Sequence, residues 1–489
     1  MVRSTSIFGA LAISVIATAL ACGCRADRAP ARKLALHPCH LEHVTVETLC
    51  GSHEVFEDRA KRDGRRIRLN VAVLPALSPH PAPDPLFILA GGPGQGAVST
   101  ASSLSIALDR VRRDRDIVFV DQRGTGKSNP LKCPAHGEPS LQDRLGGQPE
   151  EKELKGCLAA YDADPSLYTT TIAADDLDDV RAELGYAKIN LWGGSYGTRA
   201  ALVYLRRHED HVRSVTLDGA APFGLSLPLS VAKDGQRALD RLFDDCAHDP
   251  QCNRAFPDLR QRFDAHLASL RAHPAETQVT HPLTGASTPV TIRASGFAGL
   301  VRALLYVPEL SSLLPFTIDR ATKGDYGPLA AQAWTFQSAT DIATGMFLSV
   351  VCAEDVPFVT PAQITTETSG TFLGGEFVAQ TIAACNVWPR GSVDADYRKP
   401  VHSNVPTLIL SGELDPVTPP SYGEEAKRDL PNAEHRIVAG YGHGTTRPGC
   451  VGGLIADFLK AGSARGLDPE CLHAKKRPPF AVTFAGNAP

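Results

Sequence analysis

The sequence has little excess charge, no C-x-x-C pair, no internal repeat and no low-complexity tract, and these absences narrow its function. Its 50 basic and 54 acidic residues nearly cancel, so there is no strongly basic face for nucleic acid. Without C-x-x-C pairs, the cysteines lack the ligand spacing of a structural zinc site. The length of 489 residues suits a large domain with an insertion, or two domains.

Long apolar runs are also scarce, and the one near the N-terminus is short. Arg3 precedes an apolar run at 7–20 that ends in the small-residue pattern A-L-A at 19–21, as in an export signal. Because about 14 apolar residues cross only about two-thirds of a bilayer core, a cleaved signal peptide at 1–24 is favoured over a membrane anchor. Cys22 follows the pattern directly, so a lipid anchor there stays open. The segment predicts a secreted, periplasmic or cell-envelope protein.

Ten cysteines remain once Cys22 and Cys24 are set aside. Their number is even, and export to an oxidising space makes structural disulfides the expected state. Bridges between sequential neighbours would close short local loops, although sequence alone does not fix the connectivity. The favoured pairs are Cys39–Cys50, Cys133–Cys157, Cys246–Cys252, Cys352–Cys385 and Cys450–Cys471.

Short apolar segments alternate with helix-like segments in the first half of the chain. Strands are expected at 86–89, 117–120 and 189–192, and each is followed by a polar or glycine-rich loop. This alternation predicts an α/β fold, with a mostly parallel central sheet and helices on both faces.

The alternation stops near residue 223 and returns near residue 400. The segment 223–399 has helix-like stretches with scattered Pro and Gly, so we expect an inserted, mainly helical cap. The segments 36–222 and 400–489 are then the two parts of the core. Four aspartates within 175–179 lie on a predicted helix. They lack the glycine and terminal glutamate of a calcium loop, which favours a solvated helix face over a metal site.

Ser195 lies in the sequence G-G-S-Y-G, between a predicted strand and a predicted helix, as in the G-x-S-x-G turn that exposes a nucleophile. A serine hydroxyl needs a base, and the base needs an acid that orients it. Asp415 follows a predicted strand, and His443 lies in a glycine-flanked loop after the next strand. The order Ser195, Asp415, His443 therefore predicts a catalytic triad, with Glu413 as the rival acid.

A glycine-rich loop, G-G-P-G at 91–94, follows the strand at 86–89. Attack on an acyl carbon needs two N–H donors for the developing oxyanion. The backbone N–H groups of Gly92 and Tyr196 are the predicted donors. A phosphate-binding loop is the rival interpretation, but no GK[ST] sequence ends this loop. Neither a cofactor nor a metal is implied.

Five segments together resemble the secreted tripeptidyl and prolyl aminopeptidase-like serine peptidases of the α/β-hydrolase superfamily. They are AGGPG at 90–94, DQRGTGKS at 121–128, GGSYGT at 193–198, VCAED at 351–355 and LDPVTP at 414–419. The resemblance extends over almost the whole mature chain. It implies the α/β-hydrolase fold and cleavage of short peptides from a free N-terminus beneath a helical cap.

The chain departs from this family at two positions. Many relatives have His in place of Ala90, and prolyl aminopeptidases usually have Trp in place of Tyr196. Tyr196 and the long C-terminal region with Cys450 and Cys471 look closer to the tripeptidyl branch.

Glu354 and Asp355, within VCAED, are the candidates to pair with a substrate ammonium group. The alternative is a turn beside a disulfide with ordinary surface acids. Peptides are the expected partners, but two other functions stay open. The same triad serves a carboxylesterase or lipase for small esters, and a hydrolase shell can also be retained by a non-catalytic binding protein.

Overall fold

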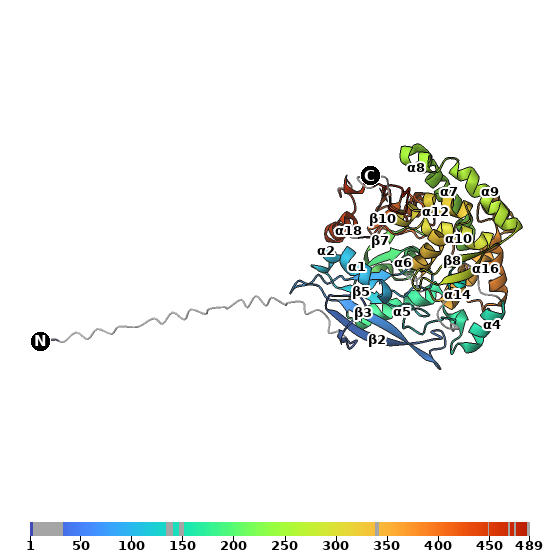
Figure 1. Ribbon diagram of the computed structural model, residues 1–489. Coiled ribbons are helices and arrows are strands. Elements are labelled where there is room, and N and C mark those ends of the chain that lie inside the picture. The colour runs from blue at the N-terminus through green and yellow to red at the C-terminus, as the bar shows by residue number, and fades with distance from the viewer. Residues whose placement is uncertain are drawn as a thin grey trace.

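The computed structural model describes most of the chain (Figure 1). The described residues are 1–2, 33–133, 140–145, 151–337, 342–447, 449–467, 470–473 and 476–486. Residues 3–24 of the predicted signal peptide, with Cys22, lie outside them. The export signal and the lipid anchor therefore stay predictions.

Within the described residues, nine strands form one sheet in the order β1-β2-β3-β5-β4-β6-β7-β10-β11. Neighbouring strands from β5 to β11 run parallel, whereas β3 pairs antiparallel with both β2 and β5, and β1 pairs antiparallel with β2. The sheet is therefore mostly parallel, as predicted. Its strands are β1 (His37–Cys39), β2 (Thr48–Phe56), β3 (Arg66–Leu74), β4 (Leu86–Leu89), β5 (Ile117–Val120), β6 (Ile189–Gly194), β7 (Val212–Asp218), β10 (Thr407–Gly412) and β11 (Ala433–Val438).

Helices lie between the strands from β4 to β11 along the chain, and two more follow β11. They are η1 (Val98–Thr100), α1 (Ala101–Ala107), α2 (Asp109–Arg112), α3 (Leu141–Arg144), α4 (Glu151–Ala160), η2 (Pro165–Leu167), α5 (Thr170–Glu183), α6 (Tyr196–His208), η3 (Glu209–His211), α17 (Pro420–Lys427), α18 (Cys450–Ala461) and α19 (Glu470–His473).

Side chains of the central strands alternate between two apolar cores. In β4, Phe87 packs in a core with residues of α5 and α6, whereas Leu86 and Ile88 pack in a second core with residues of α1 and α18. Since successive strand residues point to opposite faces, the two cores lie on the two sides of the sheet. Helices on both faces are what the run of buried apolar residues in β4 and β5 requires.

The elements between β7 and β10 add no strand to the large sheet. Figure 1 shows several of their helices gathered beside it. They are α7 (Leu227–His248), α8 (Pro250–Ala255), α9 (Leu259–Ala272), α10 (Ala294–Leu304), α11 (Pro308–Ser311), α12 (Leu314–Thr322), α13 (Gly327–Gln337), α14 (Thr344–Glu354), η4 (Val356–Phe358), α15 (Pro361–Thr368), α16 (Glu376–Val387) and a hairpin of β8 (Ala275–Thr280) and β9 (Ser287–Ile292).

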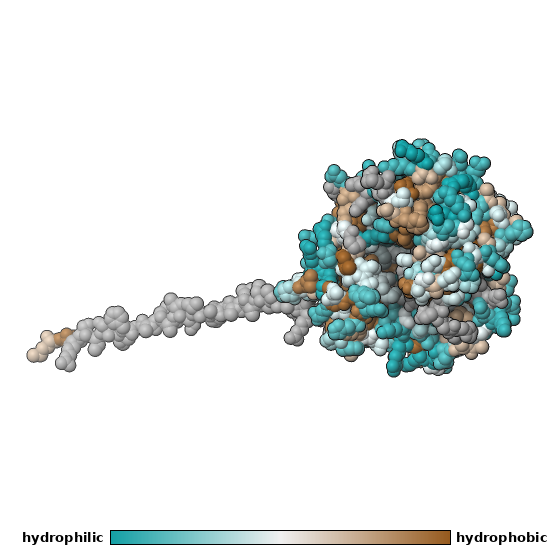
Figure 2. All heavy atoms as spheres, viewed as in Figure 1, coloured by the Kyte–Doolittle hydropathy of each residue, from teal (hydrophilic) through white to brown (hydrophobic). Residues whose placement is uncertain are grey.

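Many of these elements share a third apolar core, which includes Leu242, Phe263, Phe297 and Ile318. Figure 2 shows hydrophilic residues over much of the outer rim of this region, as expected of helices whose apolar sides face inward. We call the elements from α7 to α16 the cap. The boundaries of the cap at 223 and 399 stay predictions.

The structure joins all five predicted cysteine pairs as disulfides. The bridges span 6 to 33 residues of sequence, so each closes a local loop: Cys39–Cys50, Cys133–Cys157, Cys246–Cys252, Cys352–Cys385 and Cys450–Cys471. Among the described residues, no single helix is long and apolar enough to cross a membrane. The bent helix pair 344–358 and 361–368 has the length and composition of a membrane span, by those two criteria only.

Candidate active site

Ser195 occupies the sharp turn between β6 and α6. Its backbone has φ +55° and ψ −124°, a combination that L residues rarely adopt and that costs about 1–3 kcal/mol. The N–H of Ser195 donates to the carbonyl of Asp218 at the end of β7, at 2.9 Å. Backbone strain of this kind concentrates at functional sites, and here it falls on the predicted nucleophile.

The glycines around Ser195 are required for space. A Cβ atom on Gly193 would overlap the backbone of Gly197, and one on Gly197 would overlap the carbonyl of Leu89. A Cβ atom on Gly91 would lie 3.2 Å from the Cβ atom of Ser195. The glycine loop after β4 therefore packs directly against the nucleophile turn.

Asp415 and His443 form a hydrogen-bonded pair at the end of the sheet where β10 and β11 finish. Nδ1 of His443 lies 2.8 Å from Oδ2 of Asp415 and 3.1 Å from the hydroxyl of Thr418. The other oxygen of Asp415 accepts hydrogen bonds from the N–H groups of Val417 and Thr418. Because Asp415 orients the ring through Nδ1, Nε2 is the nitrogen left for proton transfer.

The same contacts change the acidity of both groups. Burial alone would raise the pKa of Asp415, but the charge and hydrogen bond of His443 and two backbone N–H groups lower it. Burial alone would lower the pKa of His443, but the charge and hydrogen bond of Asp415, and then the charge of Asp218, raise it. The surrounding acids thus stabilise the protonated imidazole, which is the form that a base passes through during acyl transfer.

Asp218 connects the nucleophile turn to the histidine loop. Its carbonyl accepts the hydrogen bond from Ser195, and its buried carboxylate accepts from the N–H groups of Thr445, at 2.8 and 3.0 Å, and of Thr446, at 2.7 Å. Thr445 and Thr446 come two and three residues after His443. One aspartate therefore holds the turn of Ser195 and the loop of His443 at the same edge of the sheet.

Gly92 and Tyr196, the predicted oxyanion donors, come from the two loops that meet at Ser195. Gly92 has φ +105°, a conformation that favours glycine. The side chain of Tyr196 is buried, and its hydroxyl lies 2.7 Å from Oγ1 of Thr170 and accepts a hydrogen bond from Gln122. This anchoring fixes the first turn of α6, to which the N–H of Tyr196 belongs. The oxyanion hole itself stays a prediction.

Glu354 and Asp355 are fully buried at the end of α14, so they are not the surface acids of the alternative interpretation. Glu354 accepts hydrogen bonds from the N–H and hydroxyl of Thr170, each at 2.7 Å, and from the hydroxyl of Tyr397. Burial raises the pKa of Glu354, and these bonds only partly offset that effect. Asp355 pairs with Arg199 at 2.9 Å. A substrate amine that contacts Glu354 or Asp355 would have to replace some of these hydrogen bonds. The role of the two acids in substrate binding stays a prediction.

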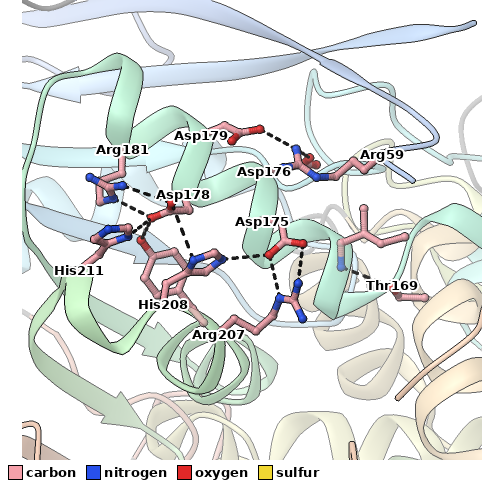
Figure 3. A network of polar contacts seen from close by, with 12 residues as sticks. Arg59, Thr169, Asp175, Asp176, Asp178, Asp179, Arg181, Arg207, His208 and His211 are labelled. Atoms are coloured by element: carbon pink, nitrogen blue, oxygen red, sulfur yellow. Dashed lines mark hydrogen bonds and ion pairs between the residues drawn. The ribbon is translucent and has the colours of Figure 1, made fainter. Parts of the chain in front are cut away.

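The aspartates of α5 are not the solvated face that we predicted. Figure 3 shows them in a network with arginine and histidine side chains. Asp176 is only 2% exposed and pairs with Arg123 at 2.6 Å and with Arg59 at 3.0 Å. Arg123 also donates to the carbonyls of Phe56, Glu57 and Leu167. The loop at 121–128 is therefore braced by Arg123. The partners of Asp176 lie in loops far from α5 in the sequence, so helical periodicity alone could not predict them.

Asp178, His208 and His211 place one potential metal ligand each within 4.8 Å of one another. Both oxygens of Asp178 already accept hydrogen bonds from Arg181, at 2.6 and 3.2 Å, and one also accepts from Tyr204. Burial alone would raise the pKa of Asp178, but the hydrogen bonds from Arg181 and Tyr204 and nearby positive charge lower it to about 2. Since the guanidinium group of Arg181 already binds the carboxylate that a metal ion would need, we assign these residues a structural role.

Asp234 is a buried carboxyl group of the cap, close enough to Asp415 for the charge of Asp415 to raise its pKa. It is 4% exposed, and burial raises its pKa to about 6, although a hydrogen bond from Tyr422 opposes this. An acid with a raised pKa destabilises the fold once it ionises, so stability should rise as the pH falls from 6 toward 3.8.

Replacing Asp234 with Asn should therefore raise the free energy of unfolding by about 1–3 kcal/mol at pH 8 and change it little near pH 4. Urea unfolding at both pH values measures this. The exposed Asp244 on the same helix is the matched control, and its Asn variant should show no such pH dependence. Equal shifts at both pH values would contradict the stated cause.

Sequence reasoning missed Thr418, Asp218 and Tyr306, all of which support the pair of Asp415 and His443. Thr418 lies within the LDPVTP segment. Asp218 directly follows the strand-like run V-R-S-V-T-L at 212–217, and an acid after a strand is the signal that identified Asp415. Tyr306 gave no signal, because its contact with the loop of His443 joins the cap to the core.

Comparison with known proteins places this site in a family. Residues 84–445 match the family described as alpha/beta hydrolase fold. Serine protease Hip1 of Mycobacterium tuberculosis is 24% identical over 433 residues, which cover 80% of this chain and 82% of that protein. Tripeptidyl aminopeptidase of Streptomyces coelicolor is 31% identical over 185 residues, or 35% of this chain and 34% of that protein. Proline iminopeptidase of Xylella fastidiosa is 21% identical and covers 77% of this chain and 88% of that protein.

These matches confirm the kinship with peptidases that the five segments indicated, and the hydrolase class of the enzyme. The matched range contains Ser195, Asp415 and His443, and it spans the cap as well as most of the sheet. The chain belongs to the α/β-hydrolase fold family.

Proposed function

We propose that the protein is an exported serine peptidase that cleaves short peptides from a free N-terminus through an acyl-enzyme on Ser195. The observation that carries this proposal is the meeting of three loops at one sheet edge. Asp218 bonds the strained turn of Ser195 through its carbonyl and the loop of His443 through its carboxylate, while Asp415 orients the imidazole.

The chemistry follows from these positions. His443 removes the proton of the Ser195 hydroxyl as the oxygen attacks the peptide carbonyl, and the N–H groups of Gly92 and Tyr196 stabilise the oxyanion. His443 then gives that proton to the leaving amine as the C–N bond breaks. Water, deprotonated by the same imidazole, hydrolyses the ester on Ser195. This chain's own residues supply each step.

The free N-terminus of the substrate needs a negatively charged or strongly accepting partner. Glu354 is a candidate because its hydrogen-bond chain through Thr170 reaches Tyr196, the residue after the nucleophile. Asp355 is the second candidate. The kinship with peptidases supports this assignment, since two of the relatives are named tripeptidyl aminopeptidase and proline iminopeptidase.

Replacing Glu354 with Gln should lower kcat/KM about 10-fold or more for peptides with a free amine, because a hydrogen bond to a charged group contributes about 1.5–3 kcal/mol. Simple esters, which carry no ammonium group, should be cleaved at nearly the wild-type rate. Paired kinetics on both substrates measure the difference. The exposed Glu376, changed to Gln, is the control. An equal loss on both substrates would remove Glu354 from substrate recognition.

The activity itself is tested by digesting a library of free and N-acetylated peptides, with p-nitrophenyl esters alongside. Release of short fragments from the free N-termini, and little release from the acetylated peptides, is the expected result. Cleavage of esters without any peptide cleavage would instead assign the protein to the carboxylesterases.

Export is supported by the five disulfides, which form and persist in oxidising compartments. Mass spectrometry of the mature N-terminus tests the signal peptide and the lipid on Cys22. A protein recovered with residues 1–24 intact would contradict cleavage.

A further inference from the structure

The cap touches the catalytic histidine just after α10. The carbonyl of Tyr306 accepts a hydrogen bond from the N–H of His443 at 2.8 Å. The ring of Tyr306 meets the imidazole edge to face, with 5.1 Å between centroids and 75° between planes. The end of α10 is therefore fixed relative to the catalytic loop, and residues one turn earlier on this helix lie close to the reacting groups.

Arg302 lies one helical turn before Tyr306. Its guanidinium group lies over the ring of Tyr306, 5.2 Å from the centroid. It is also near enough that its charge lowers the pKa of His443, against the stronger effects of Asp415 and Asp218. On its other side, a Cβ atom added to Gly235 of α7 would lie 3.5 Å from Cγ and Cδ of Arg302. The stem of Arg302 is thus held between two cap helices, beside the active site.

The Nε of Arg302 is buried without a hydrogen-bond partner. Among the residues that the structure describes, no carboxylate forms an ion pair with this guanidinium. The two acids that raise the pKa of His443 already have hydrogen-bond partners. Asp415 bonds Thr418 and His443, and Asp218 bonds Thr445. A buried donor without a partner costs free energy, and an unpaired cation beside His443 opposes formation of the imidazolium. An anion bound to the guanidinium group of Arg302 would lower both the cost of the unpaired donor and the repulsion of the imidazolium.

We infer that Arg302 binds a carboxylate of the substrate, so that the enzyme prefers peptides that carry an acidic side chain or a free C-terminal carboxylate near the scissile bond. This inference rests on the proposed hydrolysis at Ser195. A planar guanidinium forms paired, charge-assisted hydrogen bonds with a carboxylate, and the same carboxylate would neutralise the cation next to His443. Substrate binding and base catalysis would then be favoured by the same contact.

The test compares wild type with the variants R302Q and R302K on matched substrates. Peptides with Glu at successive positions are paired with the same peptides carrying Gln, and C-terminal acids are paired with C-terminal amides. The first pairing detects side-chain recognition, and the second detects recognition of the C-terminus. In wild type, kcat/KM should be higher for the carboxylate member of one pairing. In R302Q this preference should fall about 10- to 100-fold, as expected for the loss of a charged hydrogen bond, with R302K in between.

The kcat/KM for the carboxamide substrates should not fall in R302Q, since they do not bind the cation and its removal relieves its effect on the imidazolium of His443. Equal losses on acid and amide substrates, or no wild-type preference in either pairing, would overturn the inference. Labelling of Ser195 by a fluorophosphonate and the melting temperature are measured for each variant, so a misfolded protein is recognised. If wild-type protein is neither labelled at Ser195 nor cleaves any of the substrates, the proposed function is wrong. Calorimetric binding of the acid and amide peptides would then still test whether Arg302 binds a carboxylate.

Discussion

Replacing Ser195 with Ala should lower kcat by about five to six orders of magnitude while leaving the protein folded, because it removes the hydroxyl oxygen that we propose as the nucleophile. The remaining rate would come from substrate binding and from the oxyanion donors alone. Single-turnover assays with a chromogenic peptide or ester measure the loss.

Folding of the variant should be nearly unchanged. The backbone of Ser195 keeps the same strained conformation in an alanine, and its N–H still donates to Asp218. Ser103, an exposed serine on α1, is the matched control, and its change to Ala should leave kcat within about twofold of wild type. A loss of less than tenfold in the Ser195 variant would show that the hydroxyl is not the nucleophile.

Replacing Asp415 with Asn should lower kcat by about four orders of magnitude, with little change in KM. The two backbone N–H groups that bind Oδ1 of Asp415 can bond the amide oxygen equally well, so the loop should keep its shape. The amide nitrogen would then face Nδ1 of His443 and favour the tautomer with the proton on Nε2. That tautomer cannot accept the proton of Ser195.

The same change should move the pH profile. Asp415 raises the pKa of His443, so wild-type kcat/KM should fall as the pH drops through that raised value. Without the carboxylate the pKa of His443 should decrease, and the acid limb of the profile should move to lower pH. Glu413, the rival acid, bonds the N–H of Gly440 instead, and its Gln variant should retain activity within about threefold. The opposite ranking of the two variants would give the acid role to Glu413.

Sequence patterns predicted the parts of this molecule that depend on local composition. The central strands are short apolar runs, and their burial on both faces follows from that composition. The glycines at 193 and 197 belong to the G-x-S-x-G turn that the sequence indicated, and the structure gives the atoms that a side chain there would overlap. The disulfides joined sequential neighbours, where the loops to be closed are short.

Elements with weak local signals were missed. β2 (Thr48–Phe56) and the hairpin of β8 and β9 contain polar residues at many positions, since one side of each faces solvent. The network on α5 depends on Arg59 and Arg123 from distant segments, so helical periodicity alone predicted a solvated face. The role of Asp218 likewise depends on its hydrogen bonds to the loop of His443, and that of Arg302 on its position over the ring of Tyr306. Long-range pairing of charged groups is what a single sequence does not show.

The central claim is that Ser195 is a nucleophile activated by His443. Labelling with a fluorophosphonate, followed by peptide mapping, tests it most directly. The account predicts one phosphonylated residue, Ser195, loss of hydrolysis in proportion to labelling, and slow labelling once His443 is replaced by Ala. A protein that hydrolyses its substrates while Ser195 stays unlabelled, or that is inactivated by labelling at another residue, would contradict it.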